Sequence, residues 1–272
     1  MNKVKVTLND ASITARGLRP IDDTFMQKLG VDLEFCQELL RVAMDNPHLK
    51  VISCSTQKAL HNIDTRSVTI DIKCEDEDGT IFAVEVQKAN DDDHQKRVRY
   101  NSSCVQIQSL EKGASFKELP DLYMIFITEK DFLKKERVIY HIDRVIRETG
   151  EVISNGYQEI YINAQIDDGT DLAEYMKILK SETVCNNSKF PVICNLTNYY
   201  KNGNGSDNMC QAVEDYAKEY AERYAKEYAK EQMYSVAEKF ILIGNTDTEI
   251  SGATGLSIEE VSDIRSNLQL SC

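Results

Sequence analysis

Two predicted strands, joined by a short turn at residues 77–79, carry the side chains whose types and spacing could do chemistry. A three-residue hairpin loop with Gly79 in the left-handed conformation sets Asp71 directly opposite Glu85. Gln87 lies two residues after Glu85, so its side chain points to the same face of the sheet. A two-residue loop would instead place the two carboxylates on opposite faces. The constellation therefore depends on the length of this loop.

The chemistry that such a pair favours is metal binding. Two carboxylates at cross-strand distance repel each other and raise each other's pKa unless a cation lies between them. A hard divalent ion such as Mg²⁺, with Mn²⁺ as the alternative, resolves that repulsion, generates hydroxide from bound water and stabilises charge on a phosphoryl group. The Gln87 amide could orient the attacking water. The competing interpretation is an acidic pair on a solvated sheet face.

Hydrophobic periodicity indicates the elements that must position these residues. Four helices are predicted, at residues 22–45, 92–112, 170–180 and 211–240. Six strands are predicted, at residues 50–55, 67–74, 80–87, 122–128, 138–142 and 158–163. In the hairpin, Ile70, Ile72, Val84 and Val86 are expected to line one face. The strand at 122–128 is apolar almost throughout, which favours a central position in the sheet. Residues 182–209 are predicted to be a loop-rich connection and the domain boundary.

The C-terminal third has a different pattern. The predicted helix 211–240 carries a tyrosine every four residues, each followed by alanine, which indicates a face that packs against the body or a partner helix. A capping box of Ser257 and Glu260 then separates two short helical patterns that resemble a helix-turn-helix. Acidic residues on the second of these would repel phosphate, so we expect a docking module. We predict three parts, 1–207, 208–242 and 243–272, with a homo-oligomer formed through the 211–240 helix.

The overall composition limits the function classes. The 272 residues include 32 Lys and Arg against 45 Asp and Glu, a formal charge of −13, which argues against non-specific nucleic-acid binding over the whole surface. None of the 8 cysteines forms a C-x-x-C pair, which argues against a structural zinc site or a thioredoxin-type motif. No signal peptide or membrane span is expected. We therefore expect a cytoplasmic protein with no membrane association, whose cysteines are reduced and mostly buried.

The order of several sequence blocks resembles the nuclease core of the PD-(D/E)XK superfamily. The similarity is closest to its transposase-associated, recombination-promoting branch, in which the E-x-K motif is written E-x-Q, here Glu85-Val86-Gln87. The matching blocks are residues 18–26, 66–71, 75–81, 85–88, 96–101, 119–121, 126–128, 140–144, 155–157 and 161–163. They span about residues 17–210. Where relatives carry a tandem tyrosine and a nearby aspartate, this chain has Tyr100-Asn101 and Gln106.

The resemblance implies an α/β fold with a restriction-endonuclease-like mixed sheet flanked by helices, followed by a long C-terminal helix and a small helical tail. It implies that Asp71, Glu85 and the Val86 carbonyl bind Mg²⁺ and that Gln87 positions the attacking water. The superfamily's N-terminal acid is either Asp23 or Glu38. The candidates for contact with the phosphates of DNA are Arg66, Lys88, Lys96, Arg97 and Arg99. No organic cofactor is expected.

The leading functional hypothesis from the sequence is a magnesium-dependent DNA endonuclease, a hydrolase associated with transposition and recombination. Asp71 and Glu85 would hold the metal, and Gln87 would position water for in-line attack on a phosphodiester. The rival hypothesis is a nuclease-like fold that has lost catalysis and serves as a binding or assembly module through its C-terminal helices.

Overall fold

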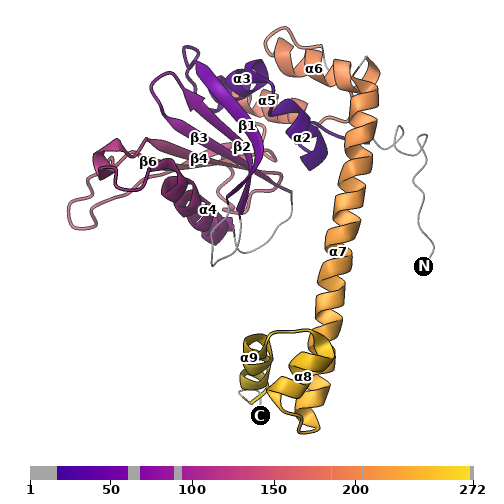
Figure 1. Cartoon of the computed structure of the whole chain (residues 1–272). Helices are drawn as coiled ribbons and strands as arrows, with labels where there is room; N and C mark the ends of the chain where they lie inside the picture. Colours follow the sequence, from indigo (N-terminus) through magenta and orange to yellow (C-terminus); the bar gives the residue numbers. More distant parts are fainter. Residues whose placement is uncertain (1–16, 61–67, 89–93, 185, 204, 270–272) are drawn as a thin grey trace. The chain divides into compact units, whose positions relative to one another are not determined.

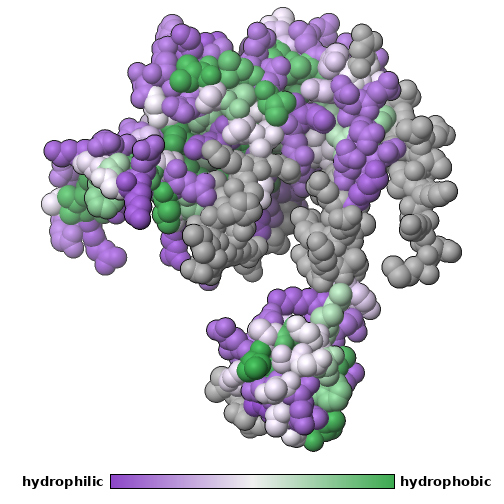
Figure 2. Space-filling model, in the orientation of Figure 1, coloured by the Kyte–Doolittle hydropathy of each residue, from purple (hydrophilic) through white to green (hydrophobic). Residues whose placement is uncertain are grey.

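The computed structural model describes residues 17–60, 68–88, 94–184, 186–203 and 205–269 (Figure 1). The chain divides into two compact units, residues 1–213 and 214–272. In the view of Figure 2 the coloured surface of the first unit is mainly hydrophilic, whereas that of the second unit combines hydrophilic, intermediate and hydrophobic residues. The first unit contains the sheet and the candidate site. None of the described helices is long and apolar enough to cross a membrane.

A mixed six-stranded sheet forms the centre of the first unit. Its strands are β1 (Val51–Leu60), β2 (Val68–Asp76), β3 (Ile81–Gln87), β4 (Leu122–Thr128), β5 (Ile139–Ile142) and β6 (Tyr157–Asn163). The spatial order is β1-β2-β3-β4-β6-β5. The β1–β2–β3 part is antiparallel, β3, β4 and β6 are parallel, and β5 pairs antiparallel with β6 at the edge. This arrangement confirms the expected restriction-endonuclease-like α/β class.

Helices cover both faces of the sheet, and each face has its own hydrophobic core. The larger core joins the sheet to α2 (Asp23–Leu29), α3 (Leu33–Ala43), α5 (Asp171–Leu179) and α6 (Pro191–Asn202). The smaller core packs α4 (His94–Ser109) against β3, β4 and β6 through Val98, Cys104 and Val105. A short 3₁₀ turn, η1 (Phe116–Glu118), precedes β4. The sheet is therefore buried on both sides, which explains why β4 is apolar nearly throughout.

The β2–β3 hairpin has the predicted loop. Gly79 has φ +82°, and the Asp76 N–H donates to the Thr80 carbonyl at 3.1 Å. Glycine is needed there because other residues rarely adopt positive φ. The strands pair from Glu75↔Ile81 to Ile72↔Val84, which is the predicted register.

Beyond Ile72 the pairing of β2 with β3 ends, and one part of the prediction is wrong. Ile72, Val84 and Val86 belong to the larger core as expected, but Ile70 packs in the smaller core with α4. The two strands separate at this point. The alternation of side chains along β2 therefore no longer places Ile70 in the same core as Ile72.

Two helix predictions are also corrected. The predicted helix 22–45 is two helices, which are separated at Gly30. The backbone of Gly30 lies so close to the sheet that a Cβ there would be 2.6 Å from the Thr56 side chain and 2.7 Å from that of Ile72. The chain breaks where its backbone touches the sheet, and Asp32 then caps α3 by accepting from the Phe35 N–H at 2.9 Å. Residues 182–209 were predicted to be loop-rich, but α6 lies within them. Its first residue, Pro191, is a helix-start signal that the asparagine-rich flanks obscure.

The second unit is a small helical assembly. It contains most of α7 (Ser206–Leu242), with α8 (Asp247–Thr254) and α9 (Ile258–Gln269), around a core of Ala237, Ile250, Leu256 and Val261. Gly255, with φ +76°, ends α8. The predicted capping box is confirmed, since Ser257 and Glu260 exchange hydrogen bonds of 2.9 and 3.1 Å. The three-part division of the chain and the oligomer through α7 stay predictions.

The described cysteines agree only partly with the expectation of reduced thiols. Free thiols are present at Cys36, Cys54, Cys74, Cys104 and Cys210. Cys194 on α6 is disulfide-bonded, so the expectation of a wholly reduced set is wrong at that position.

Candidate active site

The point where β2 and β3 separate brings Asp71 and Glu85 together. The Asp71 carboxylate accepts a hydrogen bond from the Val86 N–H at 2.8 Å, which fixes it beside the end of β3. Glu85 is 7% exposed, and Asn101 on α4 donates to its carboxylate. The Glu85 Oε1 atom is buried and has no hydrogen-bond partner among the residues that the structure describes. A buried carboxylate oxygen without a partner is costly, so this atom is suited to bind a ligand.

Burial perturbs both carboxyl groups. It raises the pKa of Asp71 to about 6, a rise opposed by the Val86 N–H and reinforced by the negative charge of Asp23. Burial, followed by repulsion from Asp71, raises the pKa of Glu85 well above its usual range. The positive charge of Arg97 lowers both pKa values, but it does not cancel these effects. A cation bound between the two carboxyl groups would favour the ionised form of both, because it offsets their desolvation and their mutual repulsion.

The donor set fits a hard divalent cation. Carboxylate oxygens are the ligands that Mg²⁺ prefers, and Mg²⁺ commonly uses one or two protein carboxylates together with water and substrate phosphate. Among the residues that the structure describes, no group of three or more acidic, histidine or cysteine side chains could hold a metal ion. The protein side chains would thus supply two ligands here, Asp71 and Glu85.

A polar contact between β3 and α4 lies beside this pair. Arg97 Nη1 donates to Gln87 Oε1 at 2.9 Å, and the Arg97 guanidinium acts electrostatically on Asp71 and Glu85. Arg97 and Asn101 are four residues apart and hence on one side of α4. This helical stripe places a positive charge and an amide donor over the end of β3.

The two candidates for the N-terminal acid have different positions. Asp23, the first residue of α2, is near enough to Asp71 to raise its pKa, and it lies 3.9 Å from the Lys88 ammonium. Lys88 also pairs with Asp22 at 3.1 Å. Arg19 joins this network by contacting Asp22 and Glu129, the residue that follows the last residue of β4.

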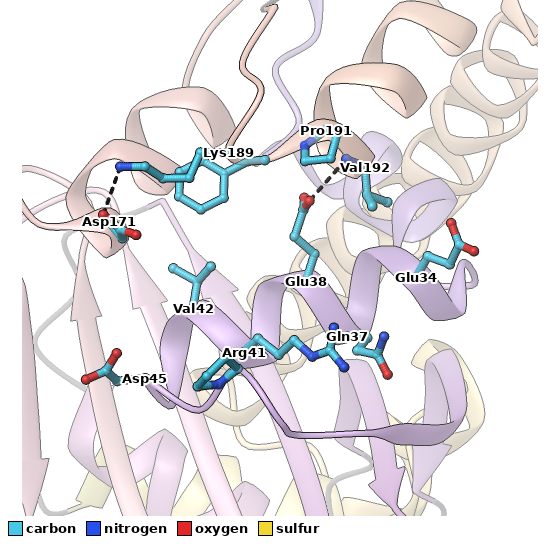
Figure 3. Close-up of a pocket in the computed structure, with 12 residues that line it drawn as sticks. Glu34, Gln37, Glu38, Arg41, Val42, Asp45, Asp171, Lys189, Pro191 and Val192 are labelled. Atoms are coloured by element: carbon cyan, nitrogen blue, oxygen red, sulfur yellow. Dashed lines mark hydrogen bonds and ion pairs between the residues drawn. The ribbon is translucent and has the colours of Figure 1, made fainter.

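Glu38 lies in a different environment. Its carboxylate accepts from the backbone N–H groups of Val192 and Ile193 at 3.1 and 3.0 Å, so it caps the start of α6 (Figure 3). Burial raises the pKa of Glu38. It lines a cavity of about 550 Å³ between α3 and the segment that begins α6. Glu38 contacts the start of α6 and Tyr175 on α5, and in the described part of the chain it has no contact with Asp71 or Glu85, so the geometry favours Asp23 as the additional acid.

The candidate phosphate contacts are spread over this region. Lys96 and Arg99 are exposed on α4, one helical turn apart, and line a second cavity of about 330 Å³. Lys88 and Arg97 are engaged by the partners given above. Arg66 lies outside the described residues. Sequence reasoning missed Asn101, which it treated only as a departure from the family pattern. Its spacing from Arg97 was the one local signal that could have identified it.

Comparison with known proteins gives one result. The family model described as PD-(D/E)XK nuclease family transposase matches residues 34–241, a segment that contains Asp71, Glu85, Gln87 and Arg97. The comparisons with curated proteins and with solved structures found no match. The matched segment covers well over half of the 272 residues and the whole sheet. The chain therefore belongs to the PD-(D/E)XK nuclease family transposases.

Proposed function

We propose that this chain is a Mg²⁺-dependent DNA endonuclease that hydrolyses phosphodiester bonds in transposition or recombination, with Mn²⁺ as the alternative ion. The observation that carries the proposal is the buried pair of Asp71 and Glu85 in a chain of a nuclease family, with one Glu85 oxygen that no described residue contacts by a hydrogen bond. Asp71, Glu85 and the Val86 carbonyl hold the ion. When bound, the ion lowers the pKa of water and stabilises charge on the phosphoryl group.

Gln87 and Arg97 together take the two roles of the lysine in E-x-K relatives, which are to orient the attacking water and to supply a positive charge. A glutamine can orient the attacking water by hydrogen bonding, but it carries no positive charge. Arg97 fixes the Gln87 amide through a 2.9 Å hydrogen bond and brings a guanidinium to the same place. That charge stabilises the negative charge that develops on the phosphate oxygens in the transition state. Asp23 is the additional acid that polarises this site.

Substrate is held locally by α4. This helix has three basic residues, Lys96, Arg97 and Arg99, and no acidic residue, although the whole chain has a charge of −13. Phosphate contacts come from such residues, and binding through few of them weakens with salt. Arg66 is a further proposed contact. Lys88 is held by Asp22 and Asp23, so it contacts phosphate only if it leaves them.

A cleavage assay tests the proposal. Supercoiled plasmid, linear duplex and single-stranded DNA, with RNA as a comparison, are incubated with the full chain and Mg²⁺, Mn²⁺ or EDTA. We expect metal-dependent nicking that Asp71→Asn and Glu85→Gln each reduce by about 10³-fold or more, since both remove charge without changing shape. Glu75→Gln, an exposed position on β2, is the matched control and should retain activity.

The outcomes separate the two functional hypotheses. Cleavage that survives both site substitutions would refute the assignment of the metal pair. Binding of DNA or of a partner chain, without cleavage and without calorimetric Mg²⁺ binding, would favour the inactive binding or assembly module acting through the C-terminal helices.

A further inference from the structure

A second polar constellation lies on the same face of the sheet as Glu85. Glu159 on β6 is aligned with Met124 on β4, which is aligned with Ala83 on β3. Residues aligned across parallel strands point to one face, and Glu85 shares that face with Ala83. Glu159 is therefore two strands, or about 10 Å, across the sheet from the proposed metal site. The two carboxylates lie on the face of the sheet that α4 covers.

The Glu159 carboxylate is fixed in orientation but is not neutralised. The Tyr157 hydroxyl donates to one of its oxygens at 2.9 Å, and the Tyr161 hydroxyl donates to the other at 2.8 Å. Tyr161 is 1% exposed, so the surrounding core holds this phenol. No lysine or arginine within the described part of the chain forms a salt bridge with Glu159. A carboxylate has about four acceptor positions, so about two remain for a ligand.

This carboxylate lines the 330 Å³ cavity between α4 and the β5–β6 edge. Lys96 and Arg99 lie on its α4 side, and neither makes an ion pair with any residue that the structure describes. Ile142 on β5, 42% exposed, provides an apolar surface. The cavity is at the small end of the range for ligand sites, about 300–1,000 Å³. It thus combines two cations, an apolar wall and an oriented acceptor within the space of about one nucleotide.

We infer that this cavity binds one unpaired nucleotide of a nucleic-acid strand, with Lys96 and Arg99 on its phosphate and Glu159 accepting N–H donors from its base. A carboxylate reads bases by accepting from their amino groups. Guanine fits best, because its Watson–Crick edge offers two adjacent N–H donors to two carboxylate oxygens. Thymine fits worst, because its single N–H lies between carbonyl oxygens that repel a carboxylate. The inference rests on the proposed function only in taking nucleic acid as the ligand.

Binding measured without divalent metal tests the inference separately from cleavage. Fluorescence anisotropy of the full chain is recorded in EDTA with short labelled thymine oligonucleotides, with and without interspersed guanines. We expect the guanine-containing strand to bind about 10-fold more tightly, the equivalent of one good carboxylate–base contact. Glu159→Gln should reduce that ratio to about 1, because the amide presents N–H groups to the base. Glu111→Gln, at an exposed position after α4, should leave the ratio unchanged.

Two further arms keep the test decisive. If Glu159→Gln fails to fold, Tyr157→Phe removes one of the bonds that orient the carboxylate and should lower the ratio. The double change of Lys96 and Arg99 to alanine should weaken all strands equally and reduce the salt slope by about 0.7, the value for one neutralised phosphate of a single strand.

The inference is overturned by equal affinity for the two strands, by a guanine preference that survives Glu159→Gln, or by an unchanged salt slope. Guanosine monophosphate that competes as well as the strand would assign the cavity to a free nucleotide and also overturn it. A guanine preference in a chain that cleaves nothing would support this site while refuting the proposed nuclease activity.

Discussion

Replacing Asp71 by asparagine should stabilise the metal-free protein, although it removes a residue proposed to be essential. The asparagine side chain keeps an oxygen that can accept the 2.8 Å hydrogen bond from the Val86 N–H. What it removes is a negative charge held beside Glu85 and Asp23. A site that binds a cation is commonly a source of instability while the cation is absent, because like charges are then left facing each other.

The size of the effect follows from the pKa of Asp71. Burial raises this pKa from 3.8 to about 6. A tenfold difference in proton affinity corresponds to about 1.4 kcal/mol, so ionising Asp71 in the folded state costs about 3 kcal/mol at most. Solvent access to this partly buried side chain reduces that to about 2 kcal/mol. The folded state binds the Asp71 proton more tightly than the unfolded state does. The free energy of unfolding of the wild type therefore decreases as pH rises from about 4 to above 6.

Denaturant unfolding in EDTA between pH 4 and pH 8 measures the effect. The free energy of unfolding of Asp71→Asn should exceed that of the wild type by about 2 kcal/mol at pH 8, and the gap should nearly close at pH 4. Asp78→Asn, in the exposed turn of the same hairpin, is the matched control and should show no such trend. Added Mg²⁺ should stabilise the wild type but not Asp71→Asn. A variant less stable than the wild type at pH 8, or a gap independent of pH, would refute the reasoning.

Two further predictions concern charge and capping. Arg97→Gln should lower single-turnover cleavage by about 10²–10³-fold while tightening Mg²⁺ binding in calorimetry, because the guanidinium repels the metal from the carboxylates. Arg99→Gln should weaken DNA binding and leave the rate at saturation unchanged; equal effects of the two changes would contradict the role of Arg97. Glu38→Ala should lower the free energy of unfolding by about 1 kcal/mol in denaturant melts, through loss of the α6 cap, with cleavage per folded molecule unchanged. A loss of cleavage without a loss of stability would restore Glu38 as a site residue.

Features of the site that depend on neighbouring residues can be predicted from the sequence. The hairpin is one, because a glycine able to adopt positive φ determines the loop, and the loop determines which residues of the two strands face each other. The central position of strand 122–128 is another such feature, because a strand of seven mainly apolar residues is typical of the centre of a sheet that is covered on both faces. The conjunction of Asp71 and Glu85 follows from these local rules.

Contacts between distant parts of the chain could not be predicted in this way. Glu38 accepts hydrogen bonds from backbone N–H groups at the start of α6, about 150 residues later in the chain. The asparagine-rich flanks of α6 make its boundaries hard to recognise in the sequence. The break at Gly30 depends on β1 and β2 lying against it, which no local pattern reveals. Ile70 alternates correctly along its strand yet packs on the other side, because the strands separate where the site is built. Sequence alternation thus fails beside the candidate site.

The replacement of lysine by Gln87 need not imply loss of catalysis. A lysine at position 87 would bring its own charge to the site, whereas the glutamine accepts a hydrogen bond from Arg97 and leaves the charge on α4. The guanidinium stays protonated at any pH at which the protein is folded, so transition-state stabilisation would not titrate at the alkaline end. The pH dependence would then be set at the acid end, where protonation of the carboxylate pair prevents metal binding. A cleavage rate of the wild type that falls at alkaline pH, with the fall abolished by Arg97→Gln, would contradict the role of Arg97 as a permanently charged group.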